Sequence, residues 1–164
     1  MPISILVAIL VFSAQRYDQK VQLEAQLEAQ KAQDRRAAAM QFVMLKHQDS
    51  FLQPASKITE AFARPQVIEL LRYLRGDERL QILSEQTNKA GLANFAIMAD
   101  LYRAVIACRE AKLCDGEILD AAYRVEVTQF YCLSKEFALP ELARKLNDPE
   151  YGAPLASYAQ DCQG

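Results

Sequence analysis

Apolar residues recur every three or four positions along most of the chain, which is the spacing of one face of an α-helix. The two longest windows of this kind cover about residues 92–112 and 117–137. Their apolar positions are Phe95, Met98, Ala99, Tyr102, Val105 and Ile106 in the first window, and Ile118, Ala122, Val125, Cys132 and Phe137 in the second. Only a short turn at 114–117 separates the windows, which predicts an antiparallel hairpin at the centre of the core.

Prolines and glycines divide the rest of the chain beyond residue 48. Pro54 predicts a first break at 51–54, because proline lacks an amide hydrogen and disfavours helix in the residue before it. Further helix limits are expected at Pro65, Gly76, Gly91 and Pro140. No β-branched run alternates for long enough to predict a strand, so we expect an all-α fold.

One long helix is predicted from about residue 18 to residue 48. It contains the tandem repeat QLEA at 22–25 and 26–29, which places Leu23 and Leu27 one turn apart on a single face. A coiled coil needs such a seam over three or four heptads, and Gln30 interrupts this one. A solvated stalk and a self-associating zipper are therefore both open, with the stalk preferred. After 34–36 the composition turns apolar, and here the helix should enter the packed body.

The first residues form a separate apolar segment. Residues 3–14 are uncharged and almost wholly apolar. As a helix they would be about 18 Å long, short of a hydrocarbon core of roughly 30 Å. A signal peptide normally begins with basic residues, which are lacking here, and a core helix should keep a polar face. We therefore expect a membrane anchor. Local thinning of the bilayer, or a start codon upstream of Met1, would account for its short length.

These segments give three predicted parts: a membrane anchor at 1–17, a stalk helix at 18–48 and a helical bundle domain at 49–164. Basic residues flanking a span are retained in the cytoplasm, and Arg16, Lys20 and Lys31 all follow the apolar run. The prediction is a single pass through the inner, cytoplasmic membrane with the body facing the cytoplasm.

The four cysteines allow two interpretations. Cys108, Cys114, Cys132 and Cys162 form no Cys-x-x-Cys pair and lie beside no histidine at metal-ligand spacing. Buried reduced thiols are the favoured interpretation, and they agree with a cytoplasmic body. The even count leaves disulfides open, with Cys108 and Cys114 as one candidate pair, and these would require an oxidising compartment.

Residues with catalytic potential are few. Net charge is -2 with both signs well represented, which gives no field for nucleic acid. His47 is the single histidine, and no Glu-x-x-His motif or phosphate-binding glycine loop occurs. Glu117 and Asp120 share a face after the turn, as the helix dipole alone favours. Tyr102, Tyr123 and Tyr131 are expected in the core. We predict no catalytic, cofactor-binding or metal-binding residue.

The order of parts resembles a group of small bacterial membrane proteins classed as a domain of unknown function. The residues that carry the resemblance are Asn94-Phe95, which would open a helix, and Leu113-Cys114-Asp115-Gly116 at the turn. The resemblance implies a helical body and membrane attachment, and it implies no activity.

An anchor, a spacer and a body without a reactive site predict a non-enzymatic, membrane-tethered interaction or scaffold protein. It would contact membrane lipid through residues 3–14 and bind a protein partner or a second copy through an exposed apolar patch. The alternative is an envelope-facing effector, such as a phage-type lysis or envelope protein, with its body outside the cytoplasm.

Overall fold

The computed structural model describes the backbone of residues 2–160 and 162, and the side chains of residues 16–160 and 162. Within these residues every regular element is a helix, which confirms the all-α prediction. The helices are α1 (Pro2–Leu45), α2 (Asp49–Phe62), α3 (Pro65–Tyr73), α4 (Gly76–Ala90), α5 (Leu92–Glu110), α6 (Gly116–Ser134), α7 (Ala138–Leu146) and α8 (Ala153–Tyr158).

Special backbone residues set several helix limits. Pro65 is the first residue of α3, where its missing amide hydrogen would have no helical partner. Gly91 separates α4 from α5 with a φ of 86°, a conformation that a side chain disfavours. Both limits lie where the sequence predicts them.

The predicted break at 51–54 is wrong, because α2 runs straight through Pro54. A proline inside a helix costs about 3 kcal/mol. Phe51, Ile58 and Phe62 share one face of α2 and are all buried, and each contributes about 1.5–3 kcal/mol. Burial of this face therefore outweighs the cost of the proline.

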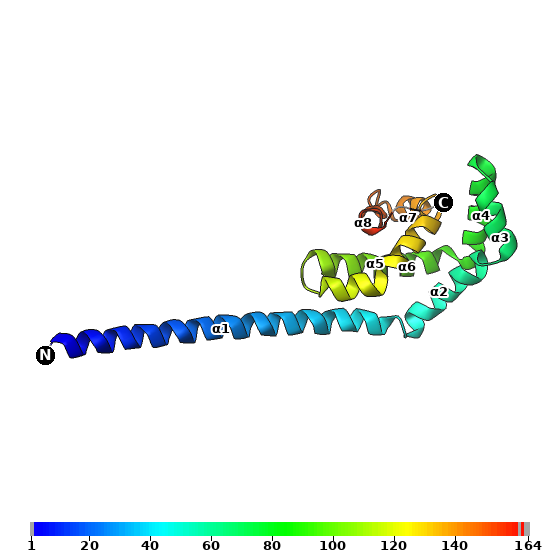
Figure 1. Cartoon of the computed structure of the whole chain (residues 1–164). Helices are drawn as coiled ribbons and strands as arrows, with labels where there is room; N and C mark the ends of the chain where they lie inside the picture. The colour runs from blue at the N-terminus through cyan, green and yellow to red at the C-terminus, as the bar shows by residue number, and fades with distance from the viewer. Residues whose placement is uncertain (1, 161, 163–164) are drawn as a thin grey trace.

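The long helix α1 has an exposed part and a packed part. Residues 16–34 are exposed along their whole length, which corresponds to about 28 Å of helix. From Arg35 onward α1 contacts α6 and the turn before it: Ala39 is fully buried, and the Asp115 amide donates to the Arg35 carbonyl at 3.0 Å. The Tyr123 hydroxyl donates to the Phe42 carbonyl. Figure 1 shows α1 extending well past the other helices.

The body packs around α5 and α6, which lie above the packed end of α1 with α7 and α8 on their other side (Figure 1). Phe95, Val105, Leu119 and Leu155, from three helices, are fully buried. The Tyr102 ring packs edge-on against two aromatic rings of α6, with centroids 5.3 Å and 6.2 Å away. Edge-to-face contacts of this kind add about 0.5–1.5 kcal/mol each beyond area burial.

All four cysteines are paired, so the preferred expectation of reduced thiols is wrong. Cys108 and Cys114 form one disulfide, as the alternative interpretation allowed, and Cys132 and Cys162 form the other. The first pair meets because the chain reverses after α5 through Lys112, whose φ of 56° is left-handed. This reversal brings the two Cα atoms within 5.4 Å. The second disulfide joins α6 to the end of the chain.

Within the described residues, no helix by itself combines the length and apolarity needed to cross a membrane. The helices α4 and α5 meet that requirement only as a pair, bent by 87° at their junction. The predicted anchor at 3–14 is helical backbone of α1, and its side chains lie outside the described residues.

Candidate functional site

An open groove of about 480 Å³ lies between α2, α5 and α6. Its floor comes from buried side chains of α5, and α2 and α6 form its two walls. The lining consists of Phe51, Ala55, Ile58, Thr59, Phe62 and Ala63 of α2, Met98 and Tyr102 of α5, and Glu126, Gln129, Phe130 and Leu133 of α6. The volume lies within the range of ordinary ligand pockets.

Helical periodicity explains why these side chains gather on one surface. On α2 the lining residues Phe51, Ala55, Ile58 and Phe62 are spaced by four, three and four positions, which is one face of a helix. They continue the hydrophobic core outward, since Phe51 packs edge-on against Tyr102 at 6.5 Å between centroids. The groove therefore lies directly on the core, and buried core side chains form much of its lining.

Glu126 is the one charged side chain among the described residues that line the groove. Its Oε1 accepts a hydrogen bond from Nζ of Lys46, at the end of α1. Its Oε2 is buried and has no hydrogen-bond partner. A buried carboxylate oxygen without a donor is uncommon in folded proteins and costs free energy. Among the described lining residues, it is the one buried side-chain nitrogen or oxygen without a partner.

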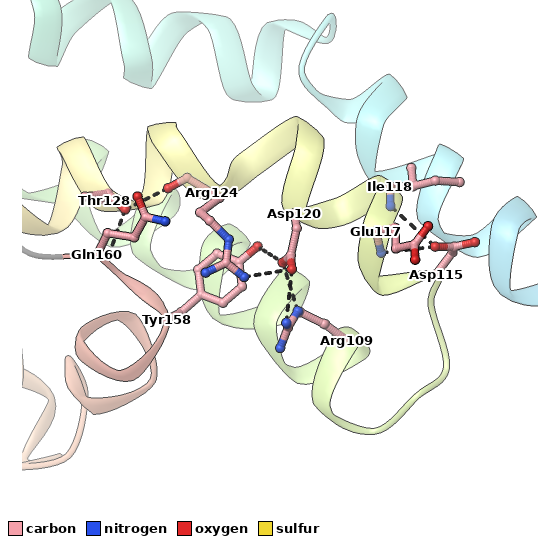
Figure 2. A network of polar contacts seen from close by, with 9 residues as sticks. All are labelled: Arg109, Asp115, Glu117, Ile118, Asp120, Arg124, Thr128, Tyr158 and Gln160. Carbon is pink, nitrogen blue, oxygen red and sulfur yellow. Dashed lines mark hydrogen bonds and ion pairs between the residues drawn. The ribbon is translucent and has the colours of Figure 1, made fainter.

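A second candidate is the polar cluster around Asp120 (Figure 2). Its Oδ2 accepts hydrogen bonds from Arg109 at 3.0 Å and from Arg124 at 2.7 Å. Its Oδ1 accepts one from the Tyr158 hydroxyl at 2.6 Å and lies 2.8 Å from Nε of Arg109. The cluster joins α5, α6 and α8 through one carboxylate.

The electrostatics of this cluster are those of a structural junction. Burial alone would raise the pKa of Asp120, but hydrogen bonds from Tyr158, Arg109 and Arg124 outweigh it and lower that pKa. Burial and the hydrogen bond to Asp120 raise the pKa of Tyr158. Asp120 thus stays ionised and Tyr158 neutral over a wide pH range. Both oxygens of Asp120 already have donors, so the carboxylate has little capacity left for a ligand.

Two further hollows have charged residues in their linings. One of about 630 Å³ lies between α1 and the turn before α6, with four basic and four acidic side chains. Arg36 faces Asp115 across it at 3.5 Å. The other, about 780 Å³, lies between α6, α7 and α8, and its Arg144 pairs with Glu141 on the same helix at 2.7 Å. In the second hollow both charged lining residues, Lys135 and Arg144, are basic, and no described lining residue has a buried side-chain nitrogen or oxygen without a partner.

The residues examined from sequence lie apart from one another. His47 is exposed in the turn after α1. Glu117 is exposed at the start of α6, where Asp115 caps the helix by accepting from the Glu117 amide at 3.1 Å. Within the described part of the chain, no three His, Cys, Asp or Glu side chains gather as metal ligands do.

The three tyrosines examined from sequence differ in burial. Tyr102 and Tyr123 are buried in the core. Burial, followed by the charge of Glu126, raises the pKa of Tyr123 to about 12. Tyr131 is half-buried and lines the 780 Å³ hollow.

Sequence reasoning overlooked Glu126, although a signal was present. It lies three residues after Tyr123 and four before Phe130, so it borders the apolar face of α6 that these residues form with Val127. A charged residue on an otherwise buried face needs a partner or a function. The structure supplies a partner for one of its oxygens only.

No protein family, no curated protein and no solved structure matches this chain. The resemblance carried by Asn94-Phe95 and the turn at 113–116 therefore adds no functional residue. Function has to be argued from the architecture and from the groove.

Proposed function

We propose that this protein is a non-enzymatic, membrane-tethered interaction protein that holds a disulfide-linked helical body away from the bilayer on a helical stalk. The body is built on the pair α5 and α6, and its binding surface is the groove between α2, α5 and α6. The observation that carries the proposal is the exposed part of α1: residues 16–34 are exposed along their whole length.

A helix exposed on all sides contributes nothing to a core, so its role is best explained by the distance it spans. It would place about 32 Å between the apolar residues 3–14 and Arg35, where α1 enters the body. Ion pairs along the surface support such a solvated helix, as between Lys31 and Glu28 at 2.8 Å.

The two disulfides favour a body outside the cytoplasm. Disulfides persist in oxidising compartments and are rare where thiols are kept reduced. The opposite orientation rests on Arg16, Lys20 and Lys31 following the apolar segment. Two covalent links are the stronger guide, so the proposal takes the orientation of the envelope-facing alternative.

Membrane fractionation tests the tether. The full-length chain should remain in membranes after carbonate extraction, and Leu10→Arg should release it, because a charge in a short apolar segment costs several kcal/mol. Leu23→Arg is the matched control, since Leu23 lies on the exposed part of α1 and is 58% exposed. Carbonate release of the unmodified chain would refute the tether.

Thiol labelling tests the orientation. A bulky maleimide added to denatured protein from cells lysed in acid should give no adduct before reduction and four adducts after it. Protease added to intact spheroplasts should degrade the body. Free thiols together with a protected body would place it in the cytoplasm and restore the first orientation.

A further inference from the structure

We infer that the groove between α2, α5 and α6 binds an amphipathic helix of a protein partner, and that a lysine or arginine of that helix pairs with Glu126. This inference rests on the proposed interaction function and names the chemistry of the partner. It follows from the shape of the groove, the nature of its walls and the one carboxylate oxygen without a donor.

The shape fits a helix. The α2 wall extends from residue 51 to residue 63, or about 18 Å, a little over three helical turns. An apolar groove lined by α2 and α6 with α5 side chains at its base is the kind of surface on which an amphipathic helix places its apolar face. Side chains at positions i, i+7 and i+11 of the partner lie on one helix face and would match the spacing of Phe51, Ile58 and Phe62.

The charge of the groove selects a basic residue. Lys46 occupies Oε1 of Glu126 and is held in place by the Ala122 carbonyl at 2.8 Å and by the Tyr123 ring, whose centroid lies 5.0 Å away. In this conformation Oε2 is buried without a donor, but the Glu126 side chain as a whole is 36% exposed, so a rotation of the carboxylate brings this oxygen to the groove. A lysine or arginine of the partner would donate a hydrogen bond to this second carboxylate oxygen, and the aromatic rings of the groove attract cations as well. An acidic side chain there would leave two carboxylates facing each other.

A second copy of this chain is a poor occupant. On α1, the exposed leucines that a second copy could offer are Leu23 and Leu27, in the part before the body. The groove lies near Lys46, just after the other end of α1. Between Leu27 and Lys46 the chain rises by about 28 Å along α1. Two copies standing side by side on one membrane would therefore hold the leucines of one far below the groove of the other.

Three labelled helical peptides of about 15 residues test the inference. The first has leucines at i, i+7 and i+11 with one lysine at the end of that face. The second has glutamate in place of the lysine, and the third has the first composition in scrambled order. Binding to the full-length chain in lipid nanodiscs is measured by fluorescence anisotropy, because free detergent could fill the groove.

We expect the lysine peptide to bind at least tenfold more tightly than the glutamate peptide, and the scrambled peptide not to bind. Glu126→Gln should remove the preference between the first two. Glu117→Gln is the matched control: it makes the same charge change at an exposed position of α6, outside the groove, and should leave the preference intact.

A second pair of variants tests the place of binding. Thr59→Trp adds bulk to the groove wall from an exposed position and should abolish binding, whereas Gln53→Trp lies on α2 outside the groove lining and should not. Equal binding of the lysine and glutamate peptides, or no binding of either, would overturn the inference. Membrane retention is measured separately. Failure of peptide binding would therefore leave the membrane tether unaffected, and release by carbonate would refute the tether without bearing on the groove. Dimerisation that depends on the groove would overturn the partner assigned here.

Discussion

Removing the Cys132–Cys162 disulfide should destabilise the body more than removing Cys108–Cys114. A cross-link lowers the entropy of the unfolded chain by an amount that grows with the length of the closed loop. The loops here are 30 and 6 residues long. At 25 °C the loop-closure relation gives about 3.6 kcal/mol for the longer loop and about 2.2 kcal/mol for the shorter one.

The comparison needs variants that keep the packing around each measured sulfur. In Cys108→Ala/Cys114→Ala, a reductant opens only the long loop. In Cys132→Ala/Cys162→Ala, it opens only the short one. The free energy of unfolding is measured in urea with and without reductant. The loss on reduction is then the effect of one cross-link, without the cavity that an alanine leaves at the buried Cys114.

We expect the loss on reduction to be larger by about 1 kcal/mol or more in the variant that keeps the long loop. Wild-type protein in the same series should lose more than either variant. Equal losses, or a larger loss for the short loop, would refute the argument that loop length sets the stabilisation in this chain.

Three further changes probe the packing and the polar contacts. Asp120→Asn should cost about 1–3 kcal/mol of the free energy of unfolding at neutral pH. Because folding lowers the pKa of Asp120, the carboxylate stabilises the folded state above its unfolded pKa of 3.8, and this stabilisation is lost as the pH falls through the lower folded pKa. The urea midpoints of the variant and the wild type should therefore converge in acid. Tyr123→Phe removes the hydrogen bond to the Phe42 carbonyl and should cost about 1 kcal/mol. Because folding raises the pKa of Tyr123 from 10.0 to about 12, the stability of the wild type should fall as the pH rises from 10 to 12, which urea denaturation at several pH values would show. Leu119→Ala should cost about 2–5 kcal/mol, because Leu119 is fully buried, and a smaller loss in calorimetry would mean that the core collapses around the gap.

The amino-acid sequence by itself determined the secondary structure and several of its limits. The apolar spacing predicts helix throughout, and Pro65 and Gly91 mark helix limits because their backbone restrictions act locally. The change of composition after 34–36 likewise marks the place where α1 enters the body. These features depend on residues within one or two turns of each other, so a local pattern contains the necessary information.

Only the tertiary structure decided the features that join distant residues. Pro54 remains inside α2 because burial against α5 outweighs a local preference. Cys132 pairs with Cys162 because the helices between them bring the two together, which spacing along the chain does not reveal. The groove has the same origin: Lys46 and Glu126 are 80 positions apart, and the unmatched oxygen exists only because α1, α2, α5 and α6 meet there. Packing energy accumulates over contacts between elements, and no local pattern in the sequence records which elements will meet.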